Sequence, residues 1–228
     1  KGLGHESSRT TEIYLADLMK SRFRYHALKL CLLMIVIFGI QYFSSGFTEL
    51  FVLNEDAWTQ PWRFLTSVFL HGGLLHLLYN IFALALFGSI LESMVGEKKF
   101  LLAFFVTGIL ANLISINFYS SSLGASGAIF GVLGALVIVR PLMVVWAFGL
   151  PMPMFVAGIL WAVGDIIGAV GFLIGNPMNN TGNIAHLSGM FFGFIFGMVY
   201  RRYFRQVRNV NVSIDEGEVR NWERSWMK

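Results

Sequence analysis

Six apolar stretches separated by polar breaks run along the 228-residue chain. Because a helix of about 20 residues crosses the ~30 Å hydrocarbon core of a bilayer, each stretch is a candidate membrane span. The fourth stretch is the shortest. The pattern predicts an all-α polytopic membrane protein with a bundle of six transmembrane helices. We place the spans at 28–46, 74–95, 100–118, 125–140, 152–173 and 184–201.

The composition supports this fold class. Hydrophobic residues make up 56% of the chain and charged residues 13%, and the mean hydropathy is +0.65. A soluble domain has about 25% charged residues. The formal net charge of +4 is too small and too dispersed to indicate nucleic acid as a partner. The single cysteine, Cys31, excludes an internal disulfide and lies in an apolar run, where we expect it to pack as a small hydrophobic residue.

The distribution of lysine and arginine predicts the orientation. With six spans both termini lie on one side, and that side receives 16 of the 17 Lys and Arg residues, Arg63 being the exception. By the positive-inside rule we expect both termini in the cytoplasm. The outer connections are then 47–73, 119–124 and 174–183. The first carries Trp58, Trp62, Phe64 and Phe69 among few charges, so we expect it to be partly embedded in the outer leaflet.

We expect three regions along the chain. Residues 1–27 form a cytoplasmic arm, either an amphipathic helix on the membrane surface or a disordered basic segment. Residues 28–202 form the six-helix core, and 203–228 a cytoplasmic tail without an assigned function. The arm is too polar to contain a cleavable signal peptide, and a first residue Lys1 rather than Met indicates a trimmed start.

Polar residues within or beside the spans are the candidates for function, because such groups are costly in hydrocarbon. They are His71, His76, Asn80, Glu92, Asn112, Ser126, Asp165 and His186. The spacing of the two histidines near the second span puts them about 140° apart around a helix, and no thiolate or carboxylate lies nearby at ligand spacing. We therefore expect no metal and no other cofactor.

Ser126 and His186 are predicted to lie at the same depth. Counted from the cytoplasmic ends of the fourth and sixth spans at 1.5 Å per residue, they lie about 21 Å and 22 Å up parallel helices. The span 184–201 also carries small residues at strict intervals of four, and the span 125–140 has several glycines, so the two backbones can approach closely. The small residues are Ala185, Gly189, Gly193 and Gly197 in the span 184–201, and Gly127, Gly131 and Gly134 in the span 125–140.

Two interpretations of Ser126 follow. A serine at a helix start can cap the free backbone N–H groups. It can also be a nucleophile, provided that a base such as His186 removes its proton.

The motifs together resemble those of the rhomboid intramembrane serine proteases, over roughly residues 28–202. They are Gly-Ala-Ser-Gly at 124–127, Ala-His-Leu-Ser-Gly at 185–189 followed by Gly193, the series His71, His76 and Asn80, and Trp62-Arg63. The resemblance implies Ser126 as the nucleophile and His186 as the general base. It implies an oxyanion hole formed by His76, Asn80 and the backbone N–H of Ser126.

The resemblance also implies supporting residues. His71 matches a second histidine near helix 2, Trp62 and Arg63 a motif of the embedded first loop, and Glu92 a glutamate that holds this loop and the helix ends. Gly127 and Gly189 flank the dyad. Helix 5 would be a mobile lateral gate. Phe130 departs from the family, which often has a tyrosine there that stacks on the catalytic histidine; stacking and activity should persist without the hydroxyl.

Asp165 on helix 5 lies about 18 Å above Pro153, near the level of the dyad. It could be a third catalytic residue, a gate residue, or a structural carboxyl bonded to a neighbouring helix, and because the family uses a dyad we favour the structural role.

The implied function is cleavage of transmembrane-helix substrates near the outer face of a membrane, which we expect to be a prokaryotic cell membrane. The rival interpretations are a catalytically inactive rhomboid-like protein that binds membrane clients, and a small transporter that uses the intramembrane polar residues. The sequence leaves the oligomeric state open.

Overall fold

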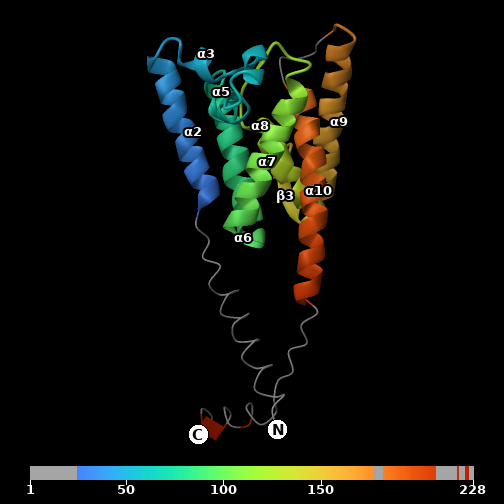
Figure 1. Cartoon of the computed structure of the whole chain (residues 1–228). Helices are drawn as coiled ribbons and strands as arrows, with labels where there is room; N and C mark the ends of the chain where they lie inside the picture. The colour runs from blue at the N-terminus through green and yellow to red at the C-terminus, as the bar shows by residue number, and fades with distance from the viewer. Residues whose placement is uncertain (1–24, 177–181, 209–219, 221–223, 226–228) are drawn as a thin grey trace.

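The computed structural model describes residues 25–176, 182–208, 220, 224 and 225. The predicted arm, 1–27, and tail, 203–228, lie mostly outside these described residues. Figure 1 shows the long helices side by side, with the short elements of the first connection gathered at one end. The bundle consists, in chain order, of α2 (His26–Phe43), α5 (Leu74–Ala83), the π-helical turn η3 (Leu84–Gly88), α6 (Ser89–Val95), α7 (Glu97–Ser115), α8 (Ser126–Val139), α9 (Met154–Leu173) and α10 (Asn183–Arg208).

Five of the described helical segments are long and apolar enough to cross a membrane, with α5, η3 and α6 forming the single segment Leu74–Val95. The chain is therefore a mostly helical polytopic membrane protein, as predicted. The sixth predicted span is α8, an apolar helix of 14 residues. At 1.5 Å per residue it is about 21 Å long, so its length alone does not confirm a count of six spans.

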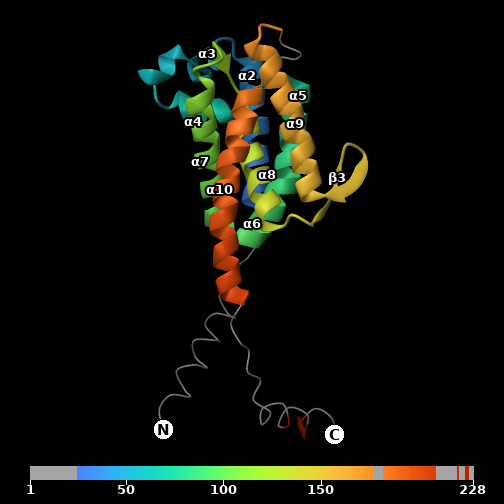
Figure 2. The ribbon, with the colours of Figure 1, turned by 90° about the vertical axis from the view of Figure 1, so that its right-hand side faces the viewer.

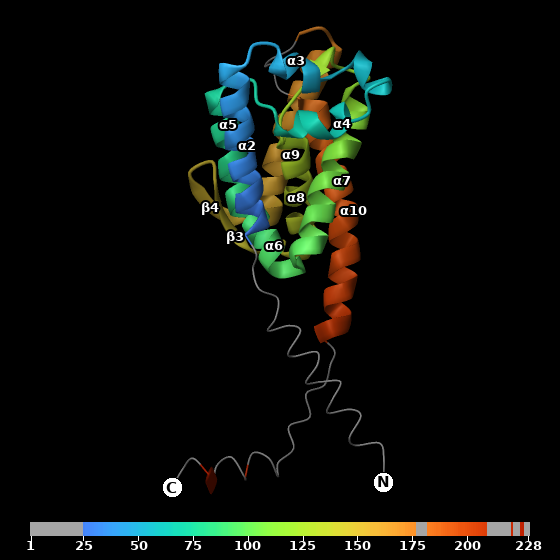
Figure 3. The same cartoon turned by 60° about the vertical axis from the view of Figure 1, so that its left-hand side comes forward.

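Helix α8 lies at the centre of the bundle. It contacts α7, α9 and α10, and nine of its 14 residues are buried. Figure 2 shows α10 running in front of α8. Figure 3 shows α7 beside α10, on the opposite side of the bundle from the hairpin of β3 (Val144–Ala147) and β4 (Leu150–Pro153). Because longer helices surround α8, this helix need not meet lipid along its whole length.

Glycines bring α8 and α10 into backbone contact. A Cβ atom added to Gly189 would collide with the carbonyl oxygen of Gly127, and one added to Gly193 would collide with that of Gly131. Gly134 lies in the same way against the Met190 carbonyl. The close approach predicted from the glycine stripes is therefore confirmed, and only glycine fits at these crossings.

The first connection is folded rather than extended. It contains α3 (Phe47–Phe51), β1 (Leu53–Asn54), η1 (Glu55–Trp58), α4 (Arg63–Thr66) and η2 (Ser67–Phe69). Strand β1 pairs antiparallel with β2 (Ser121–Ser122), in the connection that leads to α8. The connection from α2 to α5 is thus tied directly to the start of the central helix.

A second antiparallel pair, β3 (Val144–Ala147) and β4 (Leu150–Pro153), joins α8 to α9. The hydropathy pattern had assigned 152 and 153 to a helix that in the structure begins at Met154. Pro151 and Pro153 account for the difference, because proline disfavours helical backbone at the residue before it and itself lacks a backbone N–H. This hairpin was not predicted.

We predict that Gly193→Ala weakens the bundle. The added methyl group would meet the Gly131 backbone, and overpacking of this kind costs about 1–3 kcal/mol of unfolding free energy. Gly164→Ala in α9 is the matched control, because no atom lies within 4 Å of its added Cβ. The control should be neutral or stabilising by up to about 1 kcal/mol. Thermal unfolding in detergent checks this, and equal melting temperatures for the two variants would contradict it.

Candidate active site

A cavity of about 880 Å³ opens at the end of the bundle where the first connection lies. Its lining comes from the start of α5, from the 119–124 connection, and from the first turns of α8 and α10. The lining residues are Gly72, Gly73, Leu74, Leu75, His76, Tyr79, Asn112, Tyr119, Ser121, Ser122, Leu123, Gly124, Ser126, Gly127, Gly182, Ala185 and His186. Both members of the predicted dyad therefore face one cavity.

Ser126 is the first residue of α8 and is partly exposed within the cavity. The N-cap of this helix is Ala125, which has no hydroxyl, so the alternative interpretation of Ser126 as the capping residue is wrong. The residues that flank the dyad are in contact, because a Cβ added to Gly127 would lie 3.6 Å from the carbonyl oxygen of Ala185. The helix crossing therefore brings the segment of Ser126 against the segment of His186.

The ring of His186 is held by two neighbours. It stacks on Phe130 with ring centroids 4.3 Å apart and an interplanar angle of 9°, as expected for the aromatic residue at this position. Its Nδ1 atom lies 2.9 Å from Oδ1 of Asp165 on α9. Both partners of this hydrogen bond are buried, His186 being 7% and Asp165 8% exposed.

Asp165 is bonded to a neighbouring helix, as favoured from the sequence. Its partner is the predicted general base, so the third-residue interpretation stays open beside the structural one. Counting residues along α9 gives the height of Asp165 and not the direction in which it points. The separation along the chain hides the pairing further, since 21 positions lie between Asp165 on α9 and His186 on α10.

His76 and Asn80 occupy different environments. His76 lines the cavity and packs against Gly124, at which an added Cβ would lie 2.8 Å from Nε2 of the ring. Gly124 has φ +120°, so the absence of a side chain permits both this contact and this backbone conformation. Asn80 is buried, does not line the cavity, and donates from Nδ2 to the His76 carbonyl at 2.8 Å. Its place in the oxyanion hole stays a prediction that requires the side chain to rotate.

His71 packs against the ring of His76. The two rings meet edge to face with centroids 5.2 Å apart, and His71 is 2% exposed. Gln41 of α2 brackets its backbone, accepting from the His71 N–H at 3.0 Å and donating to the carbonyl at 3.3 Å. Burial, together with the neighbouring His76, lowers the pKa of His71 to about 4.

Arg63 anchors the first connection. This side chain is 4% exposed and donates to the carbonyls of Glu49 at 2.8 Å and Val52 at 2.9 Å, and from Nε to Gln60 at 2.8 Å. The adjacent Trp62 is half exposed. Arg63 therefore satisfies carbonyls that a helical or sheet partner would otherwise have to satisfy.

Asn112 on α7 provides a second anchor for the same connection. Its Nδ2 donates to the carbonyl of Phe64 at 2.8 Å and to the hydroxyl of Ser67 at 3.0 Å. The Ser67 carbonyl in turn accepts from the backbone of Gly124 at 2.9 Å. Two intramembrane polar residues that a transporter would use, Asn112 and Asp165, are thus occupied by hydrogen bonds within the bundle.

Glu92 lies at the end of the bundle away from the cavity. Its Oε1 accepts from the backbone N–H of His26 and lies 3.1 Å from Nδ1 of that histidine, and its Oε2 accepts from Ala27. Glu92 therefore caps α2, and its described hydrogen bonds do not reach the first connection that it was expected to hold. In the part of the chain that the structure describes, no three His, Cys, Asp or Glu side chains gather as a metal site would require.

Comparison with known proteins agrees with this architecture. The family model described as the Rhomboid domain matches residues 58–203. The chain is 37% identical over 147 residues to rhomboid protease GluP of Bacillus subtilis, covering 60% of this chain and 28% of that protein. It is 30% identical over 147 residues to rhomboid protease GlpG of Haemophilus influenzae, covering 64% and 72% of the two chains.

A plant relative matches to a similar degree. RHOMBOID-like protein 7 of Arabidopsis thaliana is 32% identical over 142 residues, which cover 61% of this chain and 43% of that protein. The matched region is thus less than half of the length of the GluP and plant relatives. Fold and helices together define an integral multi-pass membrane protein of helical-bundle type. The chain belongs to the rhomboid family.

We predict that the structure loses stability in acid through His71. The unfolded pKa is about 6.5 and the folded pKa about 4, so the unfolded chain binds more protons between these values. The contribution of neutral His71 is therefore fully present above pH 6.5 and is lost as the pH falls towards 4. Thermal unfolding at pH 7.5 and pH 4.5 measures the loss.

The comparison variant is His71→Asn, whose Nδ2 can replace Nδ1 in the contact with the Phe69 carbonyl. The variant should lose less stability than the parent over the same pH interval, because the amide does not titrate. Equal losses in the two proteins would mean that His71 does not contribute to the acid sensitivity.

Proposed function

We propose that the chain is an intramembrane serine endopeptidase that cleaves transmembrane segments near the outer face of the membrane with a Ser126/His186 dyad. The observation that carries this proposal is the shared cavity. Ser126 of α8 and His186 of α10 line it from two helices in backbone contact. The His186 imidazole is held by the stacked Phe130 ring and by a hydrogen bond to Asp165. Two relatives are rhomboid proteases by name, GluP and GlpG, which supports the same activity.

The chemistry requires a base because a serine hydroxyl is a weak nucleophile. The ring nitrogen of His186 that is not bonded to Asp165 is Nε2, and it takes the proton as Oγ of Ser126 bonds to the scissile carbonyl carbon. The carbonyl π electrons move to the oxygen. When the tetrahedral intermediate collapses, the C–N bond breaks and Nε2 returns the proton to the leaving amine. Water then hydrolyses the acyl-enzyme by the same two steps.

The oxyanion is stabilised by donors at the cavity wall. His76 lines the cavity, and the backbone N–H of Ser126 lies at the first turn of α8, where the helix dipole favours negative charge. Losing one such donor typically costs about 10²–10³ in kcat. Asn80 would join them after rotating its amide away from the His76 carbonyl.

The substrate is proposed to be a membrane-spanning helix whose end unwinds into the cavity. A peptide bond inside an α-helix is hydrogen-bonded and hard to attack, so segments that unwind easily should be preferred. By the positive-inside rule we expect the termini in the cytoplasm, and with that orientation the cavity opens towards the outer face. Residues 28–202 would form the protease core, with 1–27 and 203–228 outside it.

We predict that Ser126→Ala abolishes cleavage of single-span substrates reconstituted with the protein in liposomes. Removing a serine nucleophile costs about 10⁶ in kcat in a well-studied soluble protease, so no cleavage should be detected. Ser122→Ala is the matched control, because this serine also lines the cavity yet has no proposed chemical role. It should retain cleavage within about threefold of the parent.

A second readout is independent of the substrate chosen. A serine-directed fluorophosphonate should label the parent and the Ser122 variant, but not Ser126→Ala. Cleavage by the Ser126 variant at the parent rate would refute the protease. If the parent bound the substrates but neither cleaved them nor reacted with the fluorophosphonate, the result would instead favour an inactive, client-binding rhomboid-like protein.

A further inference from the structure

Asp165 holds the predicted general base by the ring nitrogen that faces away from the nucleophile. The donor and acceptor are 2.9 Å apart, and both side chains are buried between α9 and α10. With Asp165 as a carboxylate, which can only accept a hydrogen bond, the contact puts the proton of neutral His186 on Nδ1. The lone pair of Nε2 is then free to accept the proton of Ser126.

We propose that Asp165 is a positioning residue of the catalytic site. In this Ser126–His186–Asp165 triad the carboxylate selects the tautomer of His186 and stabilises its imidazolium. This proposal rests on the dyad proposed above. The carboxylate itself is not protonated during the reaction; the only proton that moves passes between Oγ of Ser126, Nε2 of His186 and the leaving amine.

The packing around the pair supports a built contact. One turn further along α9, Gly168 lets the side chain of Asn183 approach, and an added Cβ there would collide with its amide. Helices α9 and α10 therefore pack tightly against each other directly beside Asp165. The opposite arrangement, a neutral Asp165 donating to Nδ1, would leave the ring proton on Nε2 and remove the base.

Few other charged groups can alter this pair. His76 on α5 interacts with His186, and Tyr119 interacts with Asp165. The chain has no charged residue at 100–115 in α7 or at 126–139 in α8, the two other helices packed on α10. A change in the pH profile on altering Asp165 therefore reports on the Asp165–His186 contact.

The test is Asp165→Asn, which keeps the shape but removes the charge. We expect kcat to fall by about 10²–10⁴ with KM within about threefold, as for the corresponding carboxylate of soluble serine proteases. The acidic limb of the kcat/KM profile should move to lower pH, because the imidazolium loses its counter-charge. Gly164→Ala, on the open side of α9, is the control and should change neither quantity.

Three results separate the possible failures. Retained kcat in Asp165→Asn, with cleavage abolished in Ser126→Ala, would overturn the role of Asp165 and leave the protease intact. A fall in kcat with an unmoved pH profile and a lower melting temperature would make Asp165 structural only. Cleavage that survives Ser126→Ala would refute the dyad and with it the role of Asp165 in positioning His186.

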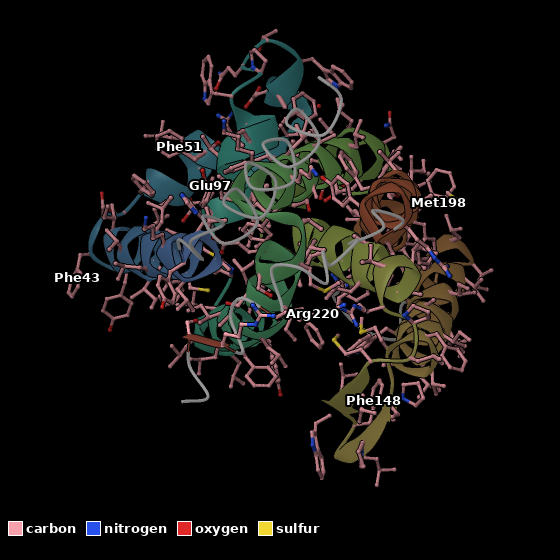
Figure 4. All side chains as sticks on the ribbon, turned by 90° about the horizontal axis from the view of Figure 1, so that it is seen from below. Phe43, Phe51, Glu97, Phe148, Met198 and Arg220 are labelled. Carbon is pink, nitrogen blue, oxygen red and sulfur yellow. The ribbon has the colours of Figure 1, made fainter. Side chains whose placement is uncertain are left out.

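A second, independent observation concerns the β3–β4 hairpin. Its side chains alternate, so that Val145 and Ala147 are buried against the bundle while Val144, Trp146 and Leu150 are 62–71% exposed. The turn places Phe148 at φ +54° before Gly149 at φ +78°, a left-handed pair in which an aromatic residue is unfavourable. Figures 2 and 4 show the hairpin projecting from the bundle, with Phe148 at its outer end.

The surroundings of this surface are apolar throughout. Residues 141–164 contain no charged side chain, and the exposed face continues along α9 through Ile159 and Val163. In a hairpin with a two-residue turn, hydrogen-bonded pairs alternate with non-bonded pairs, so Pro151 and Pro153 fall where an N–H would point outward. The outer edge of β4 therefore lacks donors that would need water or a further strand.

We infer that the exposed face of this hairpin, Val144, Trp146, Phe148 and Leu150, is an in-plane anchor inserted among lipids at the end of the bundle opposite the cavity. The unpaired backbone of β3 needs polar partners, so the hairpin lies at the boundary between acyl chains and headgroups rather than at the bilayer centre.

Spin labels test the depth. With the single cysteine Cys31 replaced by Ala, a nitroxide at Phe148→Cys in lipid nanodiscs should be relaxed by oxygen and shielded from a water-soluble nickel complex. A label at Lys98→Cys, an exposed position at the same end of the bundle, should show the reverse. Equal exposure of both labels to nickel would overturn the anchor. Dipolar broadening at 148 in sparsely loaded liposomes would assign the face to a second copy of the chain instead.

Discussion

The backbone contact between α8 and α10 is the constraint on which the site depends. At Gly127–Gly189 and Gly131–Gly193 no side chain separates the two helices, and dispersion contacts replace the lipid that larger residues would admit. Ser126 precedes the first crossing by one residue and His186 by three. Their relative positions are consequently set by rigid helical geometry rather than by a loop, which is the arrangement that chemistry at fixed distances requires.

Several backbone carbonyls of the first connection accept hydrogen bonds from buried side chains. Arg63 and Asn112 bond to carbonyls of the first connection, and the pairing of β1 with β2 joins that connection to the start of α8. Irregular backbone next to hydrocarbon is tolerated only where such partners exist or where a wet cavity supplies them. The same anchors that make the connection stable therefore also fix the wall of the cavity above Ser126.

The sequence predicted the depth of Ser126 and His186 and the contact between two helix faces, but not where individual polar side chains of α5 and α9 point. Residue counting put Ser126 and His186 at one level, and the glycine stripes predicted which helix faces meet, because both depend on the fixed rise and period of an α-helix. The direction of Asp165 around α9 and the inward turn of the Asn80 amide depend on packing between helices. The hairpin was missed because its alternation is short and its residues are as apolar as the spans on either side.

The two contacts of His186 restrict different motions. Stacking on Phe130 fixes the plane of the imidazole but leaves the ring able to turn within that plane. A hydroxyl at this position could limit the turn, and phenylalanine has none. The hydrogen bond from Nδ1 to Asp165 acts in the plane of the ring and limits the same turn. Loss of a polar contact on α8 is thus compatible with an oriented base, provided that α9 supplies the carboxylate.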